Sequence, residues 1–243
     1  MPNNNIIAAP YPISAPVESK KQMNAVPWLL WLSLPLALFP LLIWLELKAD
    51  IAISALFYDA QSASFPWREH ALTSAIHQFG RLPAALIFLG FALASVLHQR
   101  HRRMIEFVQT RFVCLSMLVC LIVVNLIKRS ANSACSWDLV EFGGHYPHLN
   151  WFASLPFAMP PGHCWPGAFS LSGFGLIAVY FYLYARASYR RATLVLALIV
   201  LYANALGFVQ VMRGAHGLSH QLWTGLICWY LSLLCYWLYT RRA

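Results

Sequence analysis

The chain has few charged residues and very few acidic ones. Only 10% of its 243 residues are charged and eight are Asp or Glu, whereas 60% are hydrophobic. Its mean hydropathy is +0.58. This composition excludes an ordinary soluble globular domain and is typical of a polytopic membrane protein. The sequence also lacks a small-residue cleavage site after its first apolar run, so we expect no cleaved signal peptide.

Long apolar runs dominate the rest of the chain. Six of them approach or exceed the roughly 17–25 residues that a helix needs to cross a bilayer. They lie near residues 27–47, 82–98, 111–127, 167–185, 192–211 and 218–240. We therefore predict an all-α polytopic membrane protein, a bundle of six transmembrane helices over residues 27–243. Residues 1–26 are polar and rich in proline, which predicts a disordered cytoplasmic tail.

The net charge of +9 invites a nucleic-acid-binding interpretation, but the distribution of the basic residues argues against it. Eleven of the 17 flank predicted spans on one side of the membrane: Lys20, Lys21, Arg100, Arg102, Arg103, Arg111, Arg186, Arg190, Arg191, Arg241 and Arg242. Cytoplasmic loops carry such an excess of Lys and Arg, so we place both termini inside. We expect a bacterial inner-membrane protein with no nucleic-acid partner, whose opposite face meets the periplasm.

The remaining basic residues lie on the opposite face, against this bias, and include Lys128, Arg129 and Arg213. Charged groups at a membrane boundary are costly to dehydrate and are usually kept for function. An arginine can hold a phosphate by paired hydrogen bonds. The alternative is that these side chains only extend to the lipid headgroups and anchor their helices. Asp138, a rare acid in the loop after the third span, can orient a base or pair with Arg129.

Three histidines on the same face are candidates for chemistry. His216 and His220 flank the start of the last span, and an imidazole can attack or protonate a phosphate. His163 lies in a loop with two Pro-Gly steps before the fourth span, where tight turns and a helix N-terminus favour anions. His216 and His220 also have the spacing of a metal pair. Zinc needs at least three protein ligands, however, and no Cys or carboxylate lies nearby, so we expect no metal.

The cysteines divide between spans and loops. Cys114, Cys120, Cys228 and Cys235 fall within predicted spans, where a thiol is usually a small apolar filler. Cys135 and Cys164 are the only two in the non-cytoplasmic loops, which face an oxidising compartment on this topology. We predict a disulfide between them that holds the two loops together. The alternative is a pair of free thiols in unrelated loops.

These segments resemble the type 2 phosphatidic acid phosphatase superfamily of membrane lipid phosphatases. That family's pattern has a Lys-led first motif, a Pro-Ser-Gly-His second motif, and a third with Arg, His and an acid. The resemblance is strongest at 126–139, 160–181 and 207–225. Within the family, the chain is most similar to a bacterial branch whose third motif contains Arg-Gly-Ala-His. Residues 65–68, His77 and Arg81 also resemble that branch. The resemblance implies a six-helix bundle with its active site at the periplasmic face.

The chain departs from the family pattern at several positions. Lys128 matches the first motif, but Cys135 and Ser136 occupy the places of its later Arg and Pro. In the third motif His216 aligns with the nucleophile. There Gln210 stands where the pattern has Arg, and His220 where it has the acid. Aligning 164–168 with the second motif puts Phe169 at the position of its histidine, whereas aligning 160–163 keeps His163.

The resemblance implies roles for these residues. His216 would attack phosphorus, Lys128, Arg129 and Arg213 would neutralise the phosphoryl oxygens, and no metal or cofactor would be needed. His220 or Asp138 would orient the nucleophile, and His163 would protonate the leaving oxygen. The implied substrate is a lipid phosphate or diphosphate from the bilayer. Two alternatives are a binder that has lost turnover, which Phe169 favours, and a lipid phosphotransferase.

Overall fold

The structure is a computed structural model that describes residues 27–149 and 162–242. Within these ranges all regular secondary structure is helical, apart from two isolated β-bridges, Asp59–Ser64 and Leu139–Tyr146. The predicted all-α class is therefore confirmed. The predicted tail, residues 1–26, lies outside the described residues, as do positions 160 and 161 of the loop before the fourth predicted span.

Four helical stretches are long and apolar enough to cross a membrane in the described part of the chain. They are the pair α5 (Ala71–Phe79) and α6 (Leu82–Arg100), then α7 (Met104–Ser130), α10 (Tyr189–Met212) and α11 (Leu218–Arg242). Each contains one of the predicted spans. The composition and length of these helices indicate a membrane-embedded protein.

The first and fourth predicted spans are interrupted, so the count of six stays a prediction. The N-terminal stretch consists of α2 (Trp28–Leu36), α3 (Phe39–Trp44), the π-helical turn η1 (Leu45–Ala49) and α4 (Asp50–Ala55). Pro35 and Pro40 each lack an amide donor, which explains the break between α2 and α3. The fourth stretch is split into α8 (Leu171–Phe174) and α9 (Ile177–Ala185).

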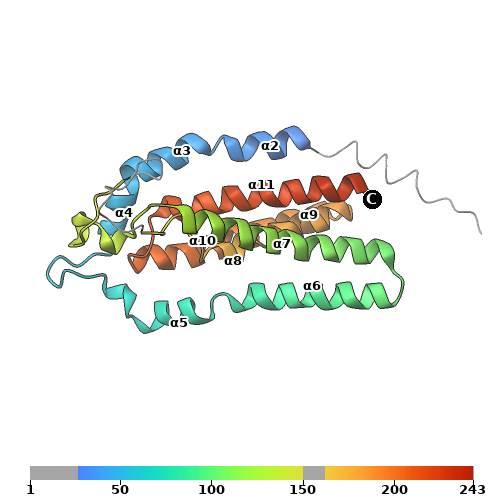
Figure 1. Cartoon of the computed structure of the whole chain (residues 1–243), viewed down its shortest axis with the longest axis horizontal. Helices are drawn as coiled ribbons and strands as arrows, with labels where there is room; N and C mark the ends of the chain where they lie inside the picture. Colours follow the sequence, from blue (N-terminus) through green and yellow to red (C-terminus); the bar gives the residue numbers. More distant parts are fainter. Residues whose placement is uncertain (1–26, 150–161, 243) are drawn as a thin grey trace, which may run out of the picture.

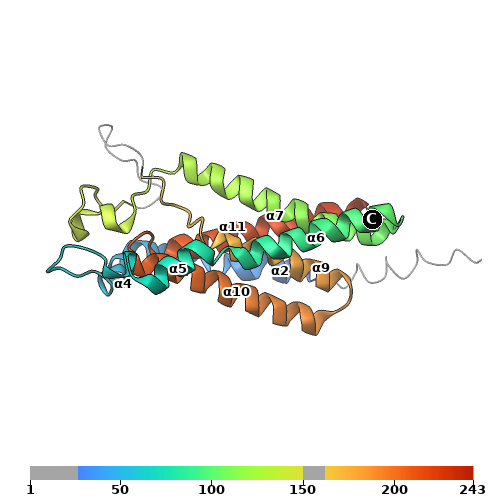
Figure 2. The ribbon, with the colours of Figure 1, turned by 90° about the horizontal axis from the view of Figure 1, so that it is seen from below.

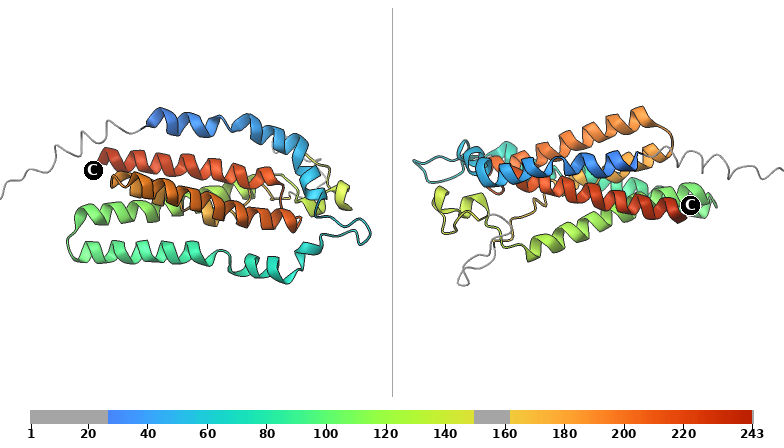
Figure 3. Two further views of the ribbon diagram at one scale, coloured as in Figure 1. Left: turned by 180° about the vertical axis from the view of Figure 1, so that it is seen from behind. Right: turned by 90° about the horizontal axis from the view of Figure 1, so that it is seen from above.

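The long helices run along one axis, with the basic turns at one end of the bundle and the polar loops at the other (Figures 1 and 3). The α6–α7 turn, the α9–α10 turn and the end of α11 gather at one end, with Arg100–Arg103, Arg186–Arg191 and Arg241. The opposite end holds α4 and three short 3₁₀ turns, η2 (Pro66–Arg68), η3 (Ser136–Asp138) and η4 (Val140–Phe142). It also holds the α10–α11 turn (Figure 2). This arrangement matches the segregation of basic residues expected from the sequence.

The outer surfaces of the long helices are apolar. Large hydrophobic side chains are exposed along α6, α7 and α10, among them Leu86, Leu89, Leu93, Leu121, Ile122, Leu198 and Leu201. Monomeric soluble proteins rarely expose contiguous apolar surface on this scale, whereas lipid chains cover it in a bilayer. The outward-facing side chains thus support membrane embedding independently of helix length.

An aromatic cluster fixes α2 against α9 and α11. The Trp31 ring lies 5.0 Å from that of Phe181 and 5.8 Å from that of Tyr236. Its indole nitrogen donates to the Tyr180 hydroxyl at 3.0 Å, and the Trp229 indole donates to the Trp31 carbonyl at 2.8 Å. The large rings therefore fill the core while their polar groups stay paired.

Two glycines allow α8, α10 and α11 to approach closely. A Cβ atom at Gly173 would lie 2.5 Å from Ala203, so the α8 and α10 backbones pack with no side chain between them. At Gly207 an added Cβ would overlap the Gln221 side chain. These contacts hold the C-terminal half of α10 against the start of α11, next to the polar end of the bundle.

Candidate active site

Two imidazoles meet at the start of α11. His216 lies in the turn before the helix and His220 in its first turn, and their ring centroids are 5.7 Å apart with the planes inclined by 59°. His220 is buried, with Nδ1 3.2 Å from the carbonyl oxygen of Cys164. The Nδ1 atom of His216 is buried and has no hydrogen-bond partner within 27–149 and 162–242.

Lys128, in the last turn of α7, brings a positive charge to this pair. Burial lowers the pKa of His216 well below the ordinary histidine value of 6.5, and the charge of Lys128 lowers it further. His220 acts in the same direction, while the Cys164 carbonyl opposes it. His216 is consequently uncharged at neutral pH, and an uncharged imidazole is the form that attacks an electrophile.

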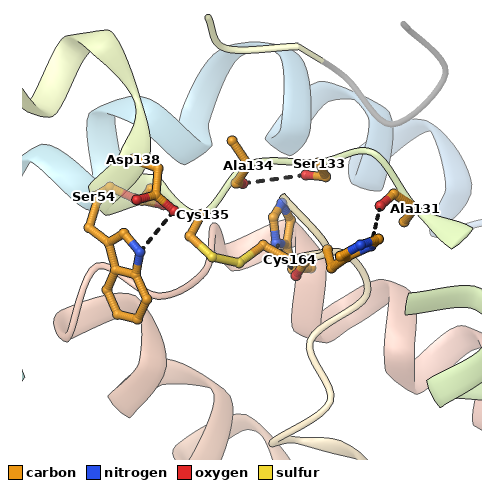
Figure 4. Close-up of a disulfide and its surroundings, with 11 residues drawn as sticks. Ser54, Ala131, Ser133, Ala134, Cys135, Asp138 and Cys164 are labelled. Carbon is orange, nitrogen blue, oxygen red and sulfur yellow. Dashed lines mark hydrogen bonds between the residues drawn. A yellow bond between two sulfur atoms is a disulfide. The ribbon is translucent and has the colours of Figure 1, made fainter. Parts of the chain in front are cut away.

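The loops that follow α7 and precede α8 lie side by side and are joined by a disulfide (Figure 4). The Cα atoms of Cys135 and Cys164 are 5.1 Å apart. The Cys164 amide donates to the Ser133 carbonyl at 2.9 Å. On the other side, the Ser54 hydroxyl of α4 donates to that of Ser136 at 3.3 Å. These links hold the Cys164 carbonyl where it meets His220.

The second-motif loop is also hydrogen-bonded directly to α11. The Gly167 amide donates to the His220 carbonyl at 3.0 Å, and the Thr224 hydroxyl donates to the Gly167 carbonyl at 3.1 Å. A Cβ at position 167 would lie 3.3 Å from the His220 backbone, which leaves little room for a side chain. The loop therefore follows the backbone of the helix that carries His220.

Arg213 extends toward α5. Its Nη1 donates to the Ser74 hydroxyl at 3.4 Å, and its buried Nε has no partner among the residues described. Burial lowers the pKa of Arg213, Arg68 lowers it further and Glu69 opposes this. The structure thus places Arg213 beside α5 and the turn that precedes it, with donor capacity left over.

The remaining predicted site residues are exposed or contact other groups. His163 is exposed, adopts a positive φ of 50° and has Nδ1 3.1 Å from the Ala131 carbonyl oxygen. Arg129 is exposed at the end of α7. Asp138 accepts from the Trp137 indole at 3.0 Å (Figure 4). It forms no ion pair with Arg129 in the described structure.

A further group surrounds Phe169 and Gln210. The buried Phe169 ring stacks on His77 of α5, with centroids 5.1 Å apart and planes inclined by 26°. The Arg81 guanidinium lies 4.9 Å from the centroid of the Phe169 ring. Gln210 is buried too, with Nε2 3.1 Å from His77 Nδ1. His77 thus contacts two of the positions at which the sequence departs from the family pattern.

Comparison with known families shows the family to which the chain belongs. A family model described as the PAP2 superfamily matches residues 109–243, more than half of the chain. The chain belongs to the PAP2 superfamily. Comparisons with curated proteins and with solved structures gave no match. PAP2 proteins are generally phosphatases, so membership indicates hydrolase chemistry on phosphate esters. The PAP2 match covers α7 to α11, and with them Lys128, His216 and His220.

Two buried carboxylates outside the PAP2 match were missed by sequence reasoning. Asp50 accepts from the Ser219 amide at 2.9 Å and from its hydroxyl at 2.5 Å, and Glu46 accepts from the Trp223 indole at 3.0 Å. Both acids therefore bind the first turns of α11. A signal was present, because two of only eight acids stand four residues apart, on one face of a helix, beside an apolar run.

These carboxylates border a small cavity next to His220. It has a volume of about 20 Å³ and is lined by polar groups that include Glu46, Asp50, Ser133, Ser136, His148 and His220. A cavity of this size holds about one water molecule. Among the residues that the structure describes, no three His, Cys, Asp or Glu side chains gather as ligands of a metal ion.

Proposed function

We propose that this PAP2 protein is a membrane phosphatase that removes phosphate from a lipid phosphate or diphosphate through a phosphohistidine on His216. The observation that supports this proposal is that His216, His220 and the positive charge of Lys128 lie close together at one end of an apolar helical bundle. A neutral imidazole beside fixed cations has the chemistry needed to attack a phosphate ester.

In the proposed first step, an imidazole nitrogen of His216 attacks phosphorus and forms the P–N bond, while the P–O bond to the lipid breaks and the lipid leaves on that oxygen. Lys128 neutralises charge on the phosphoryl oxygens, and its partly buried position strengthens this effect because the local dielectric is low. Arg213, three residues before His216, contributes unused donors to the same anion. His220, fixed by the Cys164 carbonyl, keeps the neighbouring imidazole in place. Water then hydrolyses the P–N bond.

We assign the site to the periplasmic side of a bacterial inner membrane. The basic turns occupy the other end of the bundle, and cytoplasmic faces carry the excess of Lys and Arg. A lipid substrate would place its headgroup at the polar end while its chains stay along the exposed apolar helices. This geometry supports an amphiphilic substrate, because the bilayer delivers an amphiphile at that depth.

Phosphate release by the purified full-length protein in detergent tests the proposal. The substrates are dodecyl phosphate, phosphatidic acid and an isoprenyl diphosphate, each with and without an added lipid alcohol as acceptor. We expect release from at least one, and a loss of at least about 10³-fold in His216→Ala. His101→Ala, an exposed histidine at the opposite end of α6, should retain wild-type activity.

Three outcomes would contradict the proposal in whole or in part. Wild-type protein that releases no phosphate from any of the three substrates, while binding them, would be a binder. Phosphate that appears on the added alcohol and never in solution would make the protein a phosphotransferase. Wild-type turnover in His216→Ala would leave a phosphatase but remove the proposed nucleophile.

A further inference from the structure

α5 lies outside the PAP2 match, yet its face joins the candidate site. It packs beside the C-terminal half of α10 (Figure 2). Its His77 stacks on Phe169 and meets Gln210. Gln210 is also connected to the nucleophile loop, since its carbonyl accepts from the Ala215 amide at 2.9 Å. Ala215 directly precedes His216. A single residue, Gln210, thus links His77 to the turn that carries the proposed nucleophile.

Cleavage of an alkyl phosphate needs a proton donor for the leaving oxygen. A positioned donor typically contributes about 10²–10⁴-fold to the rate. Position 169, where the pattern has a histidine, holds a buried phenyl ring that cannot give a proton. The donor must therefore come from another part of the chain.

The other imidazoles near the site are engaged elsewhere. His216 is the proposed nucleophile, and His220 is buried with Nδ1 on the Cys164 carbonyl. His163 is exposed, with Nδ1 directed at the Ala131 carbonyl. His77 is exposed as well and meets Gln210 through Nδ1, but its ring is the one that stacks on Phe169, and its Nε2 makes no hydrogen bond in the described structure. Its reactive nitrogen is therefore available to a ligand.

Two guanidinium groups flank His77 and complete an anion site. Arg81 is one helical turn further along the chain and lies over the Phe169 ring on which His77 stacks. Arg213 donates to Ser74, which is three residues before His77 on the same face of α5. Its buried Nε has no partner within the described ranges. Arginines in this arrangement favour a phosphate dianion, whose charge offsets their mutual repulsion.

We propose that His77 of α5 is the catalytic proton donor to the leaving oxygen. It would take the place of the histidine that the family pattern has at the position of Phe169, on which the His77 ring stacks. This inference rests on the proposed phosphatase function. As His216 forms the P–N bond, the P–O bond breaks and its electron pair passes to the leaving oxygen, which takes the Nε2 proton of protonated His77. In that form both ring nitrogens carry a proton, so the Gln210 amide turns to present its oxygen to Nδ1. Burial, Arg213 and Arg81 lower the pKa of His77, and the negative charge of a bound phosphate opposes them. Neutral His77 then accepts a proton from the water that attacks phosphorus, and the P–N electron pair returns to His216.

The dependence of rate on the leaving group tests this role in full-length protein. Nitrophenolate leaves without protonation, so 4-nitrophenyl phosphate does not need the donor, whereas dodecyl phosphate does. We expect His77→Gln and His77→Ala to lose about 10²–10⁴-fold on dodecyl phosphate and less than about 10-fold on 4-nitrophenyl phosphate. Gln78→Ala, the exposed neighbour on α5, should match wild type on both.

Restoring an imidazole at position 169 gives a second test. Phe169→His in the His77→Ala background should recover part of the dodecyl phosphate activity, because both positions face the same space. Equal losses on the two substrates in His77→Gln would show a structural role and overturn the inference. A leaving-group-dependent loss in His163→Ala, with none in His77→Gln, would assign the proton donor to His163 instead. Wild-type protein inactive on both substrates would reject the phosphatase function itself.

Discussion

The imidazole of His216 lies where burial and a neighbouring cation both disfavour its protonation. Its pKa is lowered well below 6.5, first by burial, then by Lys128 and then by His220. A cation nearby makes a second positive charge unfavourable, so the uncharged form persists as the pH falls. Catalysis that depends on neutral His216 should therefore extend to more acidic conditions than an exposed histidine would allow.

Removal of the Lys128 charge should change this pH dependence in a defined direction. Because Lys128 lowers the pKa of His216, Lys128→Met should raise it, and the acidic fall in kcat/KM should move to higher pH. Lys128→Arg keeps the charge and should leave the position of the fall nearly unchanged. The measurement is the pH profile of 4-nitrophenyl phosphate hydrolysis. A Lys128→Met profile that is lower in rate but unmoved in pH would contradict the electrostatic coupling.

At the scale of elements, the second-motif loop reaches the start of α11 through backbone contacts and one covalent link. The Cys164 carbonyl meets His220, the Gly167 amide binds the His220 carbonyl, and the disulfide ties Cys164 to the loop after α7. The position of His220 therefore depends on the joined loops.

Loss of the disulfide should weaken both stability and turnover. The bridge spans 29 residues, and cross-links of this kind typically contribute about 2–4 kcal/mol. We expect Cys135→Ser/Cys164→Ser to unfold at a lower temperature and to hydrolyse substrate more slowly, as measured by thermal unfolding in detergent and by phosphate release. Cys114→Ser, a free cysteine of α7, serves as the control. Identical melting temperature and rate in the double variant would show that the joined loops do not depend on the bridge.

Local sequence patterns were enough to predict some elements and residues but not others. The spans at 111–127 and 192–211 fall within α7 and α10, because long apolar runs leave few alternatives to a membrane helix. Lys128, His216 and His220 could be selected as candidates since each stands at a span end within a recognisable motif. The residues from other segments that lie next to them could be identified only from the folded structure.

Helix α5 shows why local sequence patterns do not reveal such neighbours. His77 is more than 90 residues from Phe169 in sequence, and only the packing of α5 against α10 brings the two rings together. Asp50 reaches Ser219 in the same way, across α4 and α11. The division of the first apolar run into α2 and α3 reflects Pro35 and Pro40, which a count of hydrophobic residues ignores.

On the scale of the whole molecule, the two ends of the bundle should face opposite compartments. Ser188, in the α9–α10 turn, lies at the basic end, and Ser62, exposed between α4 and η2, lies at the polar end. In bacterial cells with a permeabilised outer membrane, an impermeant maleimide should label Ser62→Cys but not Ser188→Cys. Lysis should then expose Ser188→Cys. Labelling of both before lysis would contradict the topology.

The central claim is that catalysis passes through a phosphohistidine at His216. Its most direct test is rapid quenching of purified protein with a ³²P-labelled substrate, followed by peptide mapping of the trapped label. We predict a label that survives alkali, is lost in acid and maps to the peptide containing His216, and that is absent from His216→Ala. Label on another residue, or burst-free turnover with no trapped label under conditions where dephosphorylation is slowed, would contradict the account.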